Sequence, residues 1–319
     1  MPEPEPAVVP TAAGGLRAQI QRPGPGIGSA TSADADRLLP GVVLVDGSGD
    51  GTVEHWDRWP GAIADCGAVV LCHDKPGCGG SPGDWHEQDF ADRAAESLAA
   101  LEVLRAQPGV DPDRVGLLGI SQGGWVCQQA AATRPDAVAF FVTISGPGVT
   151  PMQQERLRIA NLVDGDAEAM AWFDERARRM LAGDDPERIL ADQAVFADRP
   201  WFEAVREACS TPDLIRFGMR IGGCDPAEIL PEVRCPVFAA FGGADPSIPV
   251  ARSVAVYAER LPHDQRHVFV VYPRADHNLF VGERDRAVPL ASQLATGFFP
   301  MLTDWLASGI APARPADQS

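Results

Sequence analysis

The chain has 319 residues, of which 45% are hydrophobic and 22% are charged, so it can bury a large core and has the composition of a globular protein. Its formal net charge of −17 argues against nucleic acid or an anionic membrane as a partner. The seven cysteines include no C-x-x-C pair, and no second group of metal ligands follows Cys72 and His73. We therefore expect a reducing compartment, no disulfide framework and no metal site.

The first residues are acidic and rich in proline, and they lack the basic region and apolar core of a secretory signal. We predict a disordered arm over residues 1–15, followed by a short edge strand over residues 16–21. No run of about 18 apolar residues occurs, so no membrane-spanning helix is expected. The sequence thus indicates a soluble cytoplasmic protein.

Two buried strands are predicted next, over residues 41–45 and 68–73. The first runs into a glycine-rich turn over residues 46–51. A loop in this position can supply a backbone N–H group to an oxyanion, and we assign that role to Ser48. The alternative is a simple flexible connection. Helices are predicted over residues 54–65 and 88–107.

Residues 115–120 form an apolar run that leads into Gly119-Ile120-Ser121-Gln122-Gly123, which fits the G-x-S-x-G pattern. A helical segment follows over residues 125–133, so the strand, sharp turn and helix that this motif requires are all predicted. Such a turn exposes the Ser121 hydroxyl at a helix N-terminus, where the Gln122 N–H can hold a developing oxyanion. The pattern also occurs by chance in chains with many glycines.

The strand predicted over residues 137–144 is followed by a change of pattern. Residues 150–233 contain charged helical stretches, scattered aromatic residues and no buried strand, which predicts a helical insertion that acts as a lid. Strands over residues 236–241 and 267–271 and helices over residues 250–261 and 287–306 complete the chain. Alternating strands and helices predict an α/β fold with a mainly parallel, doubly wound sheet, formed by residues 16–149 and 234–308, and a flexible tail over residues 309–319.

Asp245 and His277 each lie just past a predicted strand, as Ser121 does, so all three are expected at the carboxyl edge of the sheet. The order Ser, Asp, His is that of a hydrolase triad in which His277 is the base and Asp245 orients it. Asp276 is a rival acid, although it adjoins His277 too closely. His73, Trp125, Trp172 and Trp201 are candidates for substrate binding. The alternative for Trp172 and Trp201 is packing within the insertion, and the alternative for His73 is a satisfied histidine beside the Asp74 turn.

These segments resemble the α/β-hydrolase superfamily, and within it the bacterial prolyl-oligopeptidase-like and dienelactone-hydrolase-like serine hydrolases. The resemblance rests on residues 72–81, on residues 111–125, and on the turns around Asp245 and His277. It implies an α/β-hydrolase fold with a helical lid. Pro76 replaces an arginine usual in the first segment, and Asp46 replaces the histidine that usually begins the oxyanion turn. A carboxylate there is unfavourable unless it points away or is paired.

The leading interpretation is a serine hydrolase that cleaves an ester or thioester of a small-to-medium substrate through an acyl-enzyme, with no cofactor. A lyase or acyltransferase on the same scaffold is the alternative, for instance one that eliminates acetate from an acylated natural-product intermediate. A non-catalytic binding protein is a third class, and it predicts that Ser121 does not react with a fluorophosphonate. A small-molecule substrate is the expected partner, and the sequence carries no signal for oligomeric state.

Overall fold

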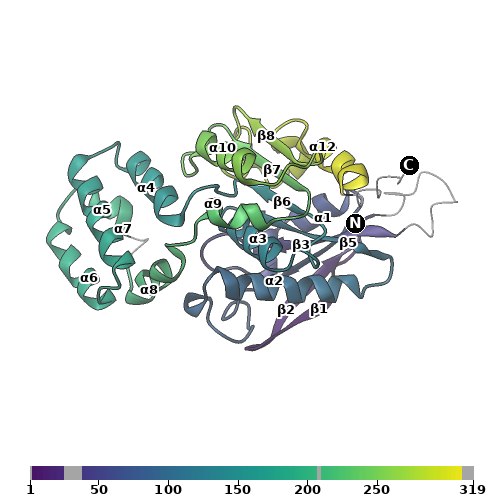
Figure 1. Ribbon diagram of the computed structural model, residues 1–319, viewed down its shortest axis with the longest axis horizontal. Helices are drawn as coiled ribbons and strands as arrows, with labels where there is room; N and C mark the ends of the chain where they lie inside the picture. Colours follow the sequence, from purple (N-terminus) through teal and green to yellow (C-terminus); the bar gives the residue numbers. More distant parts are fainter. Residues whose placement is uncertain (1, 25–37, 207–209, 311–319) are drawn as a thin grey trace.

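A computed structural model describes residues 2–24, 38–206 and 210–310. Its centre is one eight-stranded sheet with the strand order β1-β2-β4-β3-β5-β6-β7-β8 (Figure 1). The strands are β1 Glu5–Thr11, β2 Gly14–Gln21, β3 Leu39–Val45, β4 Val69–His73, β5 Val110–Ile120, β6 Phe141–Ile144, β7 Val237–Gly242 and β8 Val268–Tyr272. The last six of these are mutually parallel, while β1 and β2 pair in antiparallel fashion, as do β2 and β4. The predicted doubly wound α/β architecture is therefore confirmed.

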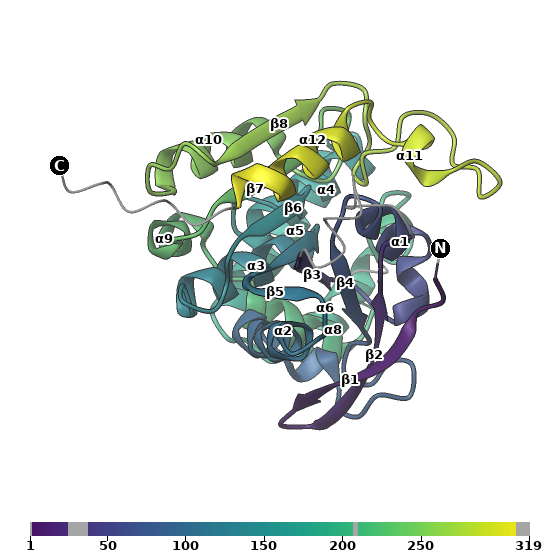
Figure 2. The same ribbon diagram turned by 90° about the vertical axis from the view of Figure 1, so that its right-hand side faces the viewer.

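Helices cover both faces of this sheet, with α2 and α3 on one side and α1 on the other (Figure 2). Two separate apolar clusters fill the two layers, which is why the central strands are apolar at nearly every position. The helices of the core are α1 Trp59–Ala64, α2 Phe90–Arg105, α3 Gln122–Thr133, α9 Pro226–Ile229, α10 Val250–Arg260, α11 Leu290–Gln293 and α12 Phe298–Asp304. The single helix predicted over residues 287–306 is thus wrong: α11, α12 and a π-helical turn, Trp305–Gly309, replace it.

The predicted disordered arm over residues 1–15 is also wrong, because β1 and β2 form a hairpin at the edge of the sheet. Val9 is fully buried while its neighbour Val8 is 60% exposed, so β1 has one face in the core. The prolines of this segment are compatible with a strand because β1 is the outermost one, where missing N–H donors are tolerated. Ile310, placed in the predicted tail, is buried, and residues 311–319 lie outside the described part.

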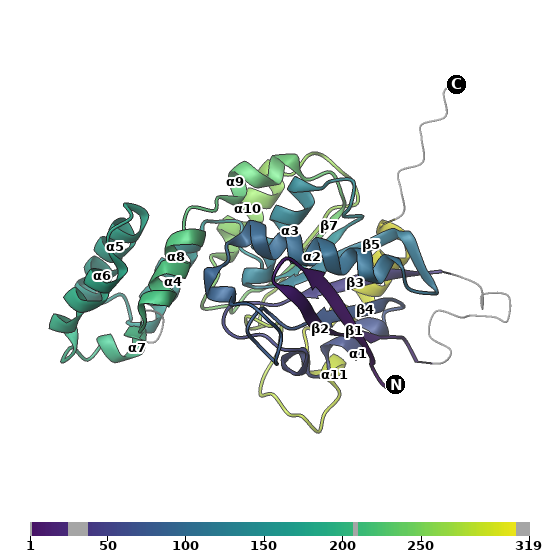
Figure 3. The same cartoon turned by 90° about the horizontal axis from the view of Figure 1, so that it is seen from below.

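A helical insertion follows β6 and projects from the core. It contains α4 Pro151–Leu162, α5 Ala167–Leu181, α6 Pro186–Asp192, α7 Phe202–Arg206 and α8 Pro212–Ile221. α4 and α8 lie nearest the sheet, and α5, α6 and α7 lie at the far end (Figures 1 and 3). The insertion ends earlier than predicted, since Leu230 and Val233 are buried in the core cluster beside α3. Among the described residues, no helix has the length and apolarity needed to cross a membrane.

Candidate active site

Ser121 sits on a strained turn between β5 and α3. Its backbone has φ 55° and ψ −118°, which is unusual for a residue with a side chain. The flanking glycines permit the turn: a Cβ on Gly119 would lie 2.3 Å from the carbonyl oxygen of Gly123, and one on Gly123 would lie 2.2 Å from that of Val45. Ser121 therefore lies half-buried at the carboxyl edge, and Gln122 begins α3 with its N–H at the helix N-terminus.

His277 and Asp245 lie at the same edge and are hydrogen-bonded to each other. Nδ1 of His277 is 2.7 Å from Oδ2 of Asp245, whose side chain is fully buried. The other oxygen of Asp245 accepts the backbone N–H groups of Ser247, at 2.8 Å, and Ile248, at 3.2 Å, and these bonds fix the carboxylate. Because Nδ1 donates to this carboxylate, the neutral imidazole presents an acceptor at Nε2.

Asp276, the rival acid, has a structural role instead. Its Oδ1 accepts the backbone N–H groups of Asn278 and Phe280, each at 2.9 Å, and its Oδ2 pairs with Arg284 at 2.8 Å. These bonds shape the loop that carries His277. They also leave Asp245 as the acid that contacts the imidazole.

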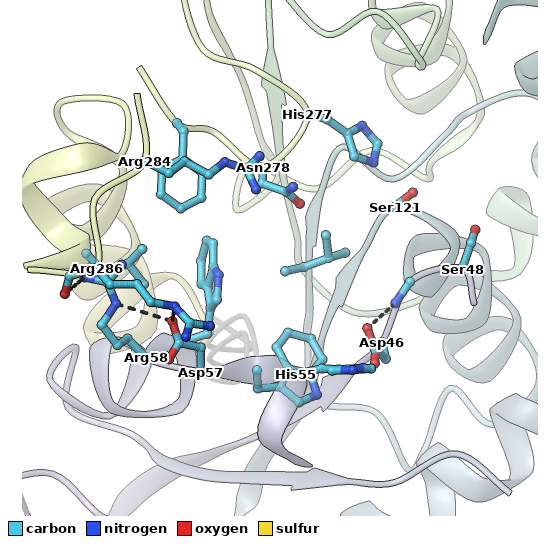
Figure 4. Close-up of a pocket in the computed structure, with 16 residues that line it drawn as sticks. Asp46, Ser48, His55, Asp57, Arg58, Ser121, His277, Asn278, Arg284 and Arg286 are labelled. Atoms are coloured by element: carbon cyan, nitrogen blue, oxygen red, sulfur yellow. Dashed lines mark hydrogen bonds and ion pairs between the residues drawn. The ribbon is translucent and has the colours of Figure 1, made fainter. Parts of the chain in front are cut away.

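Ser121 and His277 open into a cavity of about 530 Å³, which we call the Ser121 cavity (Figure 4). Its wall comes from the core and includes Ser48 and Asn278. Three arginines also border it, namely Arg58, Arg284 and Arg286. None of the residues that line this cavity belongs to the described part of the insertion, so the insertion does not cover it.

Two buried cations, Lys75 and Arg93, donate hydrogen bonds to backbone carbonyls of the turn that carries Ser48. Lys75 Nζ donates to the carbonyl oxygens of Gly47, at 2.5 Å, and Gly49. Arg93 donates to the Asp46 carbonyl at 2.8 Å and to the Gln122 side-chain oxygen at 2.7 Å. Arg93 therefore joins the two segments whose backbone N–H groups are the predicted oxyanion donors.

Burial lowers the pKa of both cations, that of Lys75 to about 7. The carboxylate of Asp46 counteracts this in each case, so these cations are also its counter-charges. One Asp46 oxygen accepts the N–H of Gly47 at 2.7 Å. In Figure 4 the side chain lies toward His55, whereas Ser121 and His277 lie across the cavity. The other Asp46 oxygen is buried without a hydrogen-bond partner among the described residues.

A second cavity, of about 220 Å³, lies between the core and the insertion, and we call it the insertion cavity. It is bordered by Ser48 and Gln122 of the core and by Arg176 of α5. Its remaining wall is mostly apolar, with contributions from α4, α5 and α8. Ser48 therefore borders both cavities.

Of the four predicted substrate-binding residues, one borders a cavity beside Ser121 and three do not. Trp125 borders the insertion cavity, where its Nε1 donates to the Val149 carbonyl at 2.9 Å. Trp172 and Trp201 instead pack on each other inside the insertion, with ring centroids 5.5 Å apart, and neither borders the cavities beside Ser121. His73 lies outside both as well: its Nδ1 bonds the Asp74 carbonyl at 2.8 Å, and burial lowers its pKa.

Sequence reasoning missed Lys75, Arg93 and Arg176. The first two become visible only through contacts between distant turns, which no local pattern reveals. Arg176 carried a local signal, because it falls on the apolar stripe of α5 that contains Phe173 and Met180. A charged residue on such a stripe marks either a buried pair or a ligand site.

Comparison with known proteins agrees with this architecture. The chain is 27% identical over 269 residues to the pimeloyl-[acyl-carrier protein] methyl ester esterase of Aeromonas hydrophila, a match that covers 79% of this chain and 93% of that protein. It is 28% identical over 120 residues to dipeptidyl-peptidase 5 of Porphyromonas gingivalis, covering 35% of this chain but 18% of the peptidase.

Among solved structures, 2,6-dihydroxy-pseudo-oxynicotine hydrolase superposes with a TM-score of 0.60 at 18% identity, over 97% of this chain and 69% of that one. A dienelactone hydrolase from Anabaena variabilis superposes with a TM-score of 0.52 at 14% identity, over 96% and 97% of the two chains. These likenesses concern the fold. The sequence profile of the alpha/beta hydrolase family matches residues 22–291, which is most of the chain. The protein therefore belongs to the alpha/beta hydrolase family.

Proposed function

We propose that the protein is a serine hydrolase that cleaves a carboxylic ester or thioester through an acyl-enzyme. The observation that carries this proposal is the Asp245–His277 hydrogen bond, next to a serine on a strained turn in the same cavity. The esterase from Aeromonas hydrophila, which matches most of the chain, supports the reaction class. The relatives lend no support to the elimination alternative.

In the first half of the reaction, Nε2 of His277 takes the Ser121 proton while Oγ attacks the substrate carbonyl carbon. The N–H groups of Ser48 and Gln122 stabilise the oxyanion, and Asp245 stabilises the imidazolium. His277 then gives its proton to the leaving oxygen or sulfur as the bond from carbon breaks. Water, activated by the same histidine, releases the acid and restores Ser121.

The test compares wild type with Ser121→Ala on a series of p-nitrophenyl esters and on a fluorophosphonate probe. We expect Ser121→Ala to abolish labelling and to lower kcat by at least about 10⁴-fold. Ser145→Ala is the matched control, because Ser145 also has positive φ and follows the neighbouring strand β6 but is buried. Wild-type protein that is folded yet neither labelled nor active would overturn the proposal.

A further inference from the structure

Arg176 is a buried cation on an otherwise apolar face of α5. It is only 7% exposed, and its guanidinium lies over the ring of Trp172, with the central carbon 5.3 Å from the ring centroid. Its Nε and Nη1 are buried and have no hydrogen-bond partner among the described residues. Stacking satisfies the face of a guanidinium, but the N–H edge still requires an acceptor.

The acidic residues nearby are already engaged. Glu155, which borders the same cavity, receives two hydrogen bonds from Arg158, at 2.6 and 2.7 Å. Glu175, next to Arg176 in sequence, receives two from Arg178, at 2.7 and 2.8 Å. An unpaired buried charge is strongly unfavourable unless a ligand completes it. The unpaired edge of Arg176 therefore points to an anionic ligand group.

The position of His277 tells which part of a substrate reaches Arg176. The leaving group must take its proton from His277, which borders the Ser121 cavity but not the insertion cavity. The leaving group therefore occupies the Ser121 cavity. The acyl chain extends in the other direction, past Ser48 and Gln122 and along the apolar wall toward Arg176.

We propose that the insertion cavity binds the acyl chain and that Arg176 binds a carboxylate at its far end. The preferred substrates are then monoesters or monothioesters of straight-chain dicarboxylic acids. A guanidinium matches a carboxylate because it keeps its positive charge and donates charge-assisted hydrogen bonds, and Nε and Nη1 of Arg176 are both unpartnered among the described residues. This inference rests on the proposed serine-hydrolase function and adds its substrate class.

The experiment uses p-nitrophenyl monoesters of straight-chain dicarboxylic acids of increasing length, each paired with the ester in which a methyl group replaces the distal carboxylate. Wild type, Arg176→Met, Arg176→Lys and the control Arg178→Met are compared. Arg178 is on the same helix but exposed. Arg176→Met should fold, since an apolar side chain replaces an unpaired buried charge.

We expect wild type to prefer the carboxylate ester once the chain is long enough to reach Arg176. Arg176→Met should lower kcat/KM for that ester by about tenfold to a hundredfold, with the neutral ester changed by less than about twofold. Arg176→Lys should restore part of the preference and Arg178→Met should keep all of it. Turnover of both esters with no preference in wild type, or equal losses in Arg176→Met, would overturn the inference while leaving the proposed function intact.

A binding measurement tests the anion site independently of catalysis. Octanoate and the neutral octanamide are titrated by calorimetry into Ser121→Ala and into Ser121→Ala carrying Arg176→Met. Octanoate should bind more tightly than the amide to the first protein only. This result supports the anion site even if no ester is turned over, and equal binding of octanoate to both proteins contradicts it. Arg176 and Trp172 also border a cavity between α5 and α6, so octanoate that binds through Arg176 without competing against ester hydrolysis would overturn the assignment to the acyl site.

Discussion

Lys75 is the only lysine in the sequence, and its ammonium group is buried beneath the Ser48 turn. It donates to two backbone carbonyls of that turn, and its Nζ lies 5.2 Å from the centre of the Trp85 ring. A neutral amine still has two N–H donors, which equals the number of carbonyls. Loss of the proton is therefore compatible with an intact turn.

Because the sequence contains one lysine, the pKa of Lys75 can be measured without overlap from other lysine signals. Burial, followed by repulsion from Arg93, lowers the pKa of Lys75 from 10.5 to about 7. Protein labelled with ¹³C at the lysine Cε should give one resonance, and we expect it to titrate near pH 7. A midpoint near 10.5 would show instead that the amine is solvated and that the turn is held in another way.

The same shift predicts how stability depends on pH. Between pH 7 and 10.5 the unfolded chain binds a proton on Lys75 that the folded chain does not, so wild-type stability should rise with pH across this window. Lys75→Met lacks the titrating amine, so this rise in stability with pH should be absent. The variant should also lose about 0.5–1.5 kcal/mol for each of the two hydrogen bonds that Nζ donates to the turn. Denaturant unfolding of both proteins from pH 7 to 9 tests this, and a difference in unfolding free energy that is constant with pH would contradict it.

Among the elements, the β1–β2 hairpin is the one whose composition led to a wrong prediction. Its prolines predict disorder, yet Arg17 on β2 reaches Asp74, which begins the turn containing Lys75, with contacts of 2.8 and 3.0 Å. The side chain of Asp74 is fully buried and also accepts the backbone N–H of Val53 at 2.9 Å. The hairpin therefore supports the turns that border the active site.

Val9 and Val8 provide a matched pair for testing this hairpin. Val9→Asp should lower the unfolding free energy by more than the roughly 1.5–3 kcal/mol of lost apolar burial, because it also buries a carboxylate. Val8→Asp, on the exposed face, should change it by less than about 0.5 kcal/mol. Chemical denaturation measures both, and equal effects of the two substitutions would mean that β1 is not packed on the core in solution.

Other elements were predictable because their signals are local. The strand, glycines and helix around Ser121 lie within one short segment, and the capping box formed by Asp89 and Asp92 marks the start of α2. The C-terminal helices were not predictable in detail. Gly297, the residue before α12, has a left-handed conformation with φ 95°, and this breaks the helix that the apolar pattern predicts over residues 287–306.

At the scale of the whole molecule, the sequence predicted the meeting of Asp245 and His277 because parallel strands bring their carboxyl ends to one edge. It did not predict which aromatic residues border the Ser121 cavity or the insertion cavity. Trp172 and Trp201 belong to a cluster that is closed within the insertion, and that closure depends on how α5, α6 and α8 pack on one another. Such packing is decided by contacts between distant segments.

The apolar cluster within the insertion predicts that the insertion and the core have different free energies of opening. The insertion buries its own apolar group, whereas β3 and β5 are buried in the sheet between two larger clusters. Few side-chain hydrogen bonds join the described parts of the two units: Gln154 donates to the Ser247 carbonyl at 3.0 Å, Asn161 donates to that of Pro246, and Arg220 donates to that of His86 at 2.7 Å. Amides of α5 and α6 should therefore exchange with deuterium through a partial opening of lower free energy than the global unfolding that exposes β5. Exchange measured by mass spectrometry at increasing denaturant concentration separates the two routes. Equal opening free energies for α5 and β5 would mean that insertion and core unfold as one unit, and that the insertion cavity forms and disappears together with the sheet.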